Sequence, residues 1–269
     1  MVIDIPKKVT NNFQGSVLFS DFFERTKACY NEEIILNFEE TKLFESNHFA
    51  VLACLVAFLE RRRNKVRFIE MQESIQNLFN YKKLENKRNQ KRIWKSLIKC
   101  QCFTSPDEVS LSDYLEGKIF PNRPEITTNP QLKMAIELCV AEIFRNAFVH
   151  SLCKEVFIAH YFSVYNKKLF LSIVDQGKTM RDLARVNNNQ GLNGVEAIEW
   201  AVKEGTSTKS ESHKGIGLNT IRQFVKQNQG KIQVLSGNGV WKQVKHRTFS
   251  KSYEKSFPGT IITLEFNLE

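Results

Sequence analysis

The first third of the chain alternates short apolar runs with longer apolar stretches. Runs of strand length lie at 33–38 and 66–70, an apolar stretch of helix length lies at 46–61, and a second helix is expected from Ser74. Strand, helix, strand, helix at this spacing is typical of a small α/β sheet. We therefore predict an α/β fold for this part of the chain.

The second half has a different order of elements. A helix is predicted from Pro130, because Asn129 can cap it and proline is tolerated in the first turn of a helix. Strands are expected next, at 156–164 and 168–174. The later elements are expected to be helices at 194–204 and 217–228, strands at 231–235 and 240–247 joined by a turn at 236–239, and a final alternating strand after Pro258.

Prolines mark the boundary between these two patterns. Four of the six prolines of the chain fall within residues 106–130. Such punctuation indicates a junction between folded units. We predict two domains, at 1–105 and 130–269, joined by a proline-containing junction at 106–129.

Composition narrows the class of protein. With 42% hydrophobic residues and 21 phenylalanines, the 269-residue chain is expected to be globular. Its six cysteines form no CxxC pairs, which favours buried free thiols in a reducing cytoplasm. No apolar run approaches the ~18 residues that a membrane span requires, and the N-terminus lacks a secretory pattern. We expect a cytoplasmic protein without a membrane segment.

The net charge of +10 comes largely from one segment. Residues 81–99, YKKLENKRNQKRIWKSLIK, carry eight lysines or arginines against a single glutamate. The segment is either a patch for nucleic acid or another polyanion, or the solvated face of a helix whose apolar residues pack inward. Both interpretations remain open from the sequence.

Polar positions stand out on the helix predicted from Pro130. Glu142, Asn146 and His150 are spaced four residues apart, which places them on one face of an otherwise apolar helix. Buried polar groups need partners, because unpaired burial is costly. The stripe is therefore a binding face, a structural hydrogen-bond network or a solvent-facing stripe.

Two further motifs follow this helix. Asp175 ends a predicted strand and Gly177 comes two residues later; a carboxylate there can accept a hydrogen bond from an exocyclic amine, and a glycine lets a flat ring approach the backbone. The stretch GTSTKSESHKGIGL at 205–218 is polar and then reaches Gly215 and Gly217. It is either a surface linker or a flap that closes over a phosphate.

The order of these motifs resembles a known family. E-x-x-x-N-A-x-x-H on a helix, D-x-G at a strand end, a polar flap running into G-x-G-L, and P-G-T before the last strand occur here in this order. They are similar to the GHKL or Bergerat-fold ATP-binding domains of gyrase B, heat-shock chaperones, MutL and histidine kinases. The resemblance covers 130–269 and implies an α/β sandwich, with helices layered on a mixed, mainly antiparallel sheet, that binds ATP and Mg²⁺.

The resemblance implies roles for residues around the base and the metal. Glu142 would be the general base that orients the attacking water or hydroxyl, and Asn146 would bring its amide oxygen to Mg²⁺. Asp175 would accept from the adenine amine, with Gly177 beside the ring. Thr260 would support the same contact through its hydroxyl group.

The resemblance also implies a phosphate-binding flap. Gly215 and Gly217 would present backbone N–H groups to the phosphates at a helix N-terminus that continues with Leu218. Thr208 and Lys209 would contact the γ-phosphate from the mobile part of the flap.

The chain departs from the family pattern at two glycines. The second glycine of D-x-G-x-G is Thr179, and the first glycine of a longer G-x-G-x-G-L lid is His213. Neither change removes a group that does chemistry, but both bear on nucleotide affinity. His150 is expected to cap or buttress its helix.

The N-terminal part resembles a STAS-type domain, the fold of anti-sigma-factor antagonists, in the order and lengths of its elements. Phosphorylated members carry a serine at the start of the long helix. Here the overlay puts Asn47 at that position, with Ser46 one residue before it. The departure bears on whether a phospho-switch operates at this site.

Three functions follow as hypotheses. In the first, the chain uses Mg·ATP hydrolysis, or phosphoryl transfer to Ser or Thr as in the anti-sigma serine-kinase branch that it resembles most, to switch its contacts with a partner protein. In the second, ATP gates an interaction without catalysis. In the third, ATP gates a nucleic-acid-associated or stress-defence module that uses residues 82–99. A homodimer is compatible with each of them.

Overall fold

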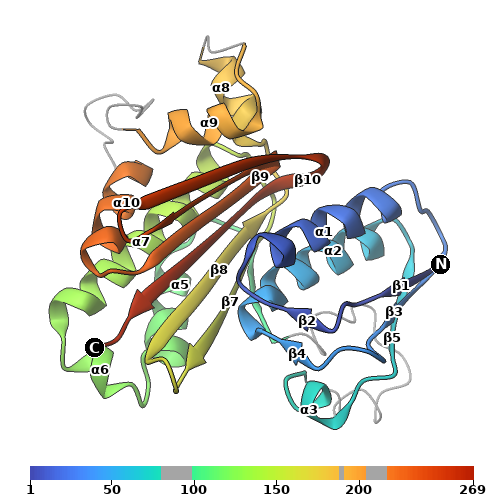
Figure 1. The fold of residues 1–269 in the computed structure, drawn as a ribbon, viewed down its shortest axis with the longest axis horizontal. Helices are drawn as coiled ribbons and strands as arrows, with labels where there is room; N and C mark the ends of the chain where they lie inside the picture. The colour runs from blue at the N-terminus through green and yellow to red at the C-terminus, as the bar shows by residue number, and fades with distance from the viewer. Residues whose placement is uncertain (80–98, 188–190, 204–216) are drawn as a thin grey trace.

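The computed structural model describes residues 1–79, 99–187, 191–203 and 217–269. The protein is of mixed α/β class, as predicted, and contains a three-stranded sheet, a five-stranded sheet and a short two-stranded sheet (Figure 1). Residues 81–98 of the basic segment lie outside the described ranges, so neither interpretation of that segment is tested.

The N-terminal elements form a parallel sheet with the strand order β1-β3-β5. Both predicted strands and the long apolar helix are confirmed, whereas β1 and α1 were not predicted. Asn12 starts α1 by accepting a hydrogen bond from the backbone N–H of Gly15 at 2.9 Å. The elements are β1 (Val2–Asp4), β2 (Lys8–Val9), α1 (Phe13–Thr26), β3 (Glu33–Asn37), β4 (Leu43–Phe44), the 3₁₀ turn η1 (Ser46–His48), α2 (Phe49–Arg61), β5 (Lys65–Ile69) and α3 (Glu73–Gln76).

The larger sheet has the strand order β6-β7-β8-β10-β9, and neighbouring strands pair antiparallel. A mainly antiparallel sheet was predicted for the C-terminal part. The first strand of this sheet comes from residues 101–103, ahead of the predicted junction. The strands are β6 (Gln101–Phe103), β7 (Val156–Ser163), β8 (Lys168–Asp175), β9 (Lys231–Val244) and β10 (Arg247–Asn267).

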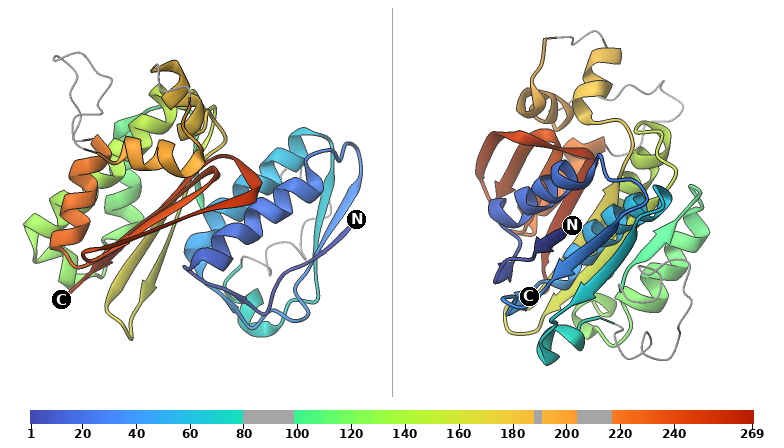
Figure 2. Two further views of the ribbon diagram at one scale, coloured as in Figure 1. Left: turned by 45° about the horizontal axis from the view of Figure 1, so that its top comes forward. Right: turned by 90° about the vertical axis from the view of Figure 1, so that its right-hand side faces the viewer.

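Helices cover the face of this sheet that points away from α1 and α2 (Figure 2, left). The longest, α7, starts as predicted: Asn129 accepts from the N–H of Leu132 at 3.0 Å and Pro130 is the first helical residue. The segment 106–129, predicted to be a junction, contains three of the helical elements. The helical elements of the C-terminal part are α5 (Glu108–Tyr114), the π-helical turn η3 (Leu115–Ile119), α6 (Pro124–Thr127), α7 (Pro130–Val149), α8 (Met180–Val186), α9 (Gly194–Ala201) and α10 (Gly217–Gln227).

Strand β9 folds back on itself. A straight strand of its length would span roughly 46 Å, yet the N–H of Lys245, just after its end, donates to the carbonyl of Gly230, just before its start, at 3.3 Å. The reversal falls at the predicted turn 236–239, where Gly237 has a φ of +58°. Because β10 pairs with β9 along both parts of β9, β10 folds back as well, across two register shifts between Ser252 and Thr260.

Helix α2 lies between the two sheets (Figure 1). It contacts β5 on one side and β7 and β8 on the other, and its residues from Phe49 to Ala57 are all buried. A helix that is apolar on every face has to be covered all round. Successive side chains of β7, one of the strands it packs against, alternate between two cores. Phe157 and Ala159 belong to the core shared with α2, whereas Ile158 belongs to the core under α7.

A buried polar contact accompanies this packing. Asn47, in η1 just before α2, is fully buried and donates through Nδ2 to the side chains of Asn11 and of Ser172 on β8, at 2.6 Å and 2.9 Å. Ser172 in turn shares a hydrogen bond of 3.0 Å with Thr263 on β10. Asn47, which the STAS resemblance overlays on the phosphorylated serine, therefore makes a buried contact between the N-terminal part and the five-stranded sheet.

We expect the shared core to contribute strongly to stability. Phe257 of β10 is fully buried in the core that contains α1 and α2, so replacing it with alanine should lower the free energy of unfolding by about 3–5 kcal/mol. The matched control is Phe249→Ala on the same strand, where the ring is 45% exposed and a loss below about 1 kcal/mol is expected. Denaturant unfolding measures both, and equal losses would contradict a shared core.

Candidate functional site

Glu142 and Asn146 form a connected pair on α7. Glu142 is 3% exposed, so its carboxylate needs donors. The Nδ2 of Asn146 donates to Oε1 at 3.1 Å, and Arg145 donates to Oε2 at 3.3 Å. The predicted stripe along this helix is therefore a hydrogen-bonded pair, and the two donors fix the orientation of the carboxylate.

Arg145 belongs to this group but was not predicted from the sequence. It also donates to Oε1 of Glu108, on α5, at 2.9 Å and 2.8 Å from two of its nitrogens. These two hydrogen bonds to one oxygen hold the guanidinium group in one orientation. Its position three residues after Glu142 was the only signal in the sequence, because residues three apart on a helix lie side by side.

Asp175 ends β8 as predicted and is 5% exposed. Within the described residues its carboxylate accepts one hydrogen bond, from the N–H of Gly177 at 2.8 Å. Burial raises the pKa of Asp175 from 3.8 to about 7, and the Gly177 N–H only partly offsets this. A buried carboxylate with a single donor has room for another donor and would be stabilised by it.

Thr260 lies next to Asp175 across the sheet, and Ser236 lies one strand further away. Thr260 of β10 is the register partner of Asp175 on one side and of Ser236 of β9 on the other. The Thr260 and Ser236 hydroxyls are 2.9 Å apart, and Ser236 also accepts from the N–H of Met180 at 2.9 Å. Ser236 was read only as part of a turn, so the fold-back of β9 is what brings it here.

Gly177 is required by a close approach of the backbone. A Cβ atom at this position would lie 2.2 Å from the carbonyl oxygen of Ser151, just after α7. That carbonyl accepts from the N–H of Lys178 at 2.7 Å, and the N–H of Ser151 donates to the carbonyl of Asn146 at 3.2 Å. These bonds connect the Asp175 loop to the end of the helix that carries Glu142 and Asn146.

The N-terminal part also holds this loop. Arg61, at the end of α2, donates to the side-chain oxygen of Gln176 at 2.6 Å and forms an ion pair with Glu155. Gln176 lies between Asp175 and Gly177 in the chain. The residue next to the buried carboxylate is therefore anchored by an element more than a hundred positions away in the sequence.

The remaining candidate residues fall into two groups. Thr208, Lys209 and Gly215 of the predicted flap lie outside the described residues. Gly217 begins α10 with a φ of +67°, and Leu218 packs against the core under that helix. His150 occupies the C-cap position of α7, as expected.

Asn146 is the residue whose side chain suits Mg²⁺ as a ligand. Because its Nδ2 donates to Glu142, its Oδ1 is directed elsewhere and has no hydrogen-bond partner among the described residues. An amide oxygen is a ligand of the kind that Mg²⁺ accepts, with the remaining positions filled by phosphates and water. In the described ranges no three His, Cys, Asp or Glu residues are grouped so that they could hold a metal by themselves.

Comparison with known proteins assigns no family. A scan of the chain against models of protein families finds no match, and a search of curated proteins finds no match either.

Of the helices in the described part of the chain, none combines the length and apolar character that crossing a bilayer requires. All six cysteines are free thiols.

The raised pKa of Asp175 predicts a pH-dependent stability. From about pH 4 to about pH 7 the folded state holds a proton that the unfolded state releases, so this group makes the free energy of unfolding fall as pH rises. Asp175→Asn removes that cost, which is at most about 4 kcal/mol. Relative to wild type, the variant should be more stable at pH 8 than at pH 5 in urea titrations.

The control for this effect is Asp113→Asn, at an exposed position on α5. Its stability relative to wild type should be the same at both pH values. A difference between Asp175→Asn and wild type that does not change with pH would show that Asp175 is ionised normally in the folded protein.

Proposed function

We propose that the chain binds Mg·ATP in the manner of GHKL proteins and uses hydrolysis or phosphoryl transfer to switch its contacts with a partner protein. The observation that carries the proposal is the buried carboxylate of Asp175, which has one hydrogen-bond donor and is connected through Ser151 to the Glu142–Asn146 pair. Hydrogen bonds thereby connect the Asp175 carboxylate to the chemically different Glu142–Asn146 pair.

Recognition of adenine is the part of the proposal that rests on Asp175. The exocyclic amine of the base would supply the donor that the carboxylate lacks, and the gain is large because the site is desolvated. Thr260 lies on the neighbouring strand, and its hydroxyl group, which shares a hydrogen bond with Ser236, would hold a water molecule against the ring. Binding would also stabilise the ionised form of Asp175.

Chemistry at the γ-phosphate rests on α7. Glu142 would orient the attacking water or hydroxyl group and accept its proton, and Asn146 would present its oxygen to the metal. When bound, Mg²⁺ supplies charge that offsets the negative phosphates. The flap that ends at Gly217 would close over the phosphates, where α10 begins and its dipole favours an anion.

A second function, ATP-gated binding without catalysis, is favoured by one observation. An oxygen of Glu142 accepts from Arg145, and Arg145 is fixed by Glu108. A carboxylate oxygen that is engaged in this ion pair is less available to hold an attacking water. The switch between binding partners would then depend on occupancy of the site rather than on turnover.

Adenine recognition can be tested with a nucleotide that lacks the amine. Wild-type protein should bind ATP about 10- to 100-fold more tightly than purine riboside triphosphate, because a hydrogen bond to a charged group contributes about 1.5–3 kcal/mol. In Asp175→Ala this preference should disappear. Titration calorimetry measures all four affinities. A preference that survives the substitution unchanged would remove Asp175 from the base-binding role.

The catalytic role can be tested with Glu142→Gln. The variant should lose at least about 100-fold in ATP turnover, since general bases contribute 10²–10⁴-fold, and should keep its affinity for ATP. Phosphate release measures turnover. The matched control is Glu137→Gln, a half-buried glutamate on the same helix, which should turn over ATP like wild type.

The outcomes of this experiment separate the two candidate functions. Turnover that is unaffected by Glu142→Gln overturns the general-base role. Binding of ATP with no turnover in wild type supports the non-catalytic switch instead.

A further inference from the structure

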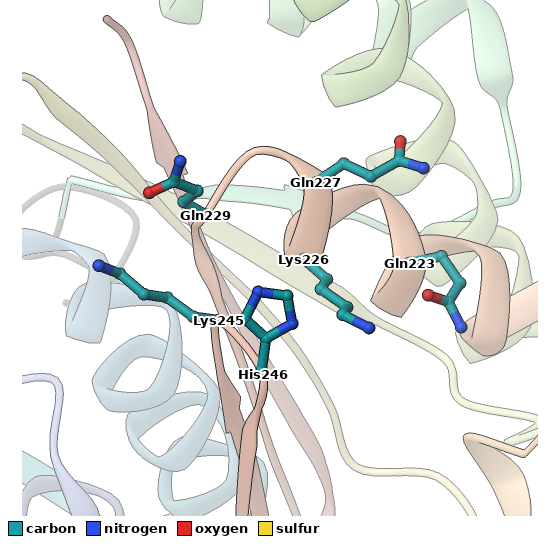
Figure 3. Close-up of a pocket in the computed structure, with 6 residues that line it drawn as sticks. All are labelled: Gln223, Lys226, Gln227, Gln229, Lys245 and His246. Carbon is teal, nitrogen blue, oxygen red and sulfur yellow. The ribbon is translucent and has the colours of Figure 1, made fainter.

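A polar pocket lies at the end of α10 opposite to Gly217 (Figure 3). Its volume is about 480 Å³, within the ~300–1,000 Å³ range of small-molecule sites. An 11-residue helix spans roughly 16 Å, so α10 separates this pocket from the proposed phosphate flap. The pocket is lined by Gln223, Lys226, Gln227, Gln229, Lys245 and His246.

Backbone hydrogen bonds fix the two segments that form the pocket. The N–H of Gly230 donates to the carbonyl of Val225 at 2.9 Å, which ends α10, and the N–H of Lys245 donates to the carbonyl of Gly230 at 3.3 Å. Gln229 and Lys245 both adopt positive φ angles, of 55° and 53°. The end of α10 and the turn between β9 and β10 are therefore held together before any ligand arrives.

The lining has the chemistry of an anion site. It contains no carboxylate, and within the described part of the chain none of the six side chains forms a hydrogen bond or an ion pair. The ammonium groups of Lys226 and Lys245 carry positive charge, the glutamine amides donate hydrogen bonds, and the histidine ring donates one or carries charge. All of these groups suit phosphate oxygens.

A simpler explanation covers only part of the lining. Lys226 lies in the last turn of α10, where a cation offsets the helix dipole. That effect does not account for Lys245 and His246, which come from the other segment. In Figure 3 the side chains of Lys245 and Gln229 lie on one side and those of Lys226 and Gln223 on the other, with His246 between them.

We propose that this pocket binds an extended phosphate polyanion: successive phosphates of a single-stranded nucleic acid or of an inorganic polyphosphate. The spread of the cations on both sides of His246 fits two or more charges in a row better than a single phosphate. The net charge of +10 would attract such a ligand from a distance. The site is independent of ATP binding.

The test compares two pairs of substitutions that change the charge equally. Lys226→Gln with Lys245→Gln removes the pocket cations, whereas Lys118→Gln with Lys154→Gln removes two exposed lysines elsewhere. Binding of a fluorescein-labelled single-stranded oligonucleotide and of tripolyphosphate is measured over a series of salt concentrations. The pocket pair should weaken binding about tenfold or more and reduce the salt slope by about 1.4, since each phosphate contact on a single strand contributes about 0.7.

The outcomes decide both the site and its ligand. Loss that is confined to the pocket pair supports the proposal; it identifies a nucleic-acid strand if only the oligonucleotide binds, and a polyphosphate if tripolyphosphate binds as well or alone. Equal loss in both pairs would mean that binding follows net charge alone, and would overturn it. The proposal would also be overturned if Mg·ATP displaced the oligonucleotide and the pocket pair of substitutions left its affinity unchanged. Absence of binding of either probe to wild type would overturn it as well.

Discussion

The structure depends on the burial of α2 between two sheets. Most of its length is apolar on every face, so neither the three-stranded nor the five-stranded sheet can cover it alone. Covering one side with β5 and the other with β7 and β8 places the N-terminal sheet and the C-terminal sheet on a common core. Residues 156–159 of β7 and 169–175 of β8 are then buried, and all of them except Ser172 and Asp175 are apolar, as expected of strands covered on both faces.

This packing also sets where polar groups have to be satisfied. Asn47 is paired with Asn11 and Ser172 across the contact, and Lys231 of β9 reaches both the carbonyl of Asn11, at 2.9 Å, and Glu265, at 3.2 Å. His48 is fully buried beside them, and burial lowers its pKa to about 4. It is therefore neutral at physiological pH and adds no unpaired charge to the core.

The candidate site lies where α2 and α7 both reach the end of β8. Arg61 holds Gln176 from one side and Ser151 contacts Gly177 from the other, so the loop after Asp175 is fixed by two helices that come from distant parts of the chain. A change in the N-terminal part that moves Arg61 would move this loop directly. In the proposed function, this contact would couple a partner bound to the N-terminal part to the nucleotide site.

The sequence by itself determined the elements that carry the site. The cap and proline that start α7, the spacing of Glu142 and Asn146, the strand ended by Asp175 and the turn at 236–239 follow from local rules, because each depends on neighbours in the chain. The same rules gave the mixed α/β class. They also indicated Gly177. The reason expected from the sequence was space for a flat ring, and the structure adds the close approach of the Ser151 carbonyl.

Only the tertiary structure decided which of these residues meet. The contact of Arg145 with Glu108 of α5, that of Ser236 with Thr260 and that of Arg61 with Gln176 join residues far apart in the chain, so none of these three contacts has a local signature. The pocket beside His246 likewise exists because the end of α10 lies against a turn of the sheet. Hydrophobic burial is non-directional, so the apolar pattern of α2 requires that it be covered but does not specify which strands cover it.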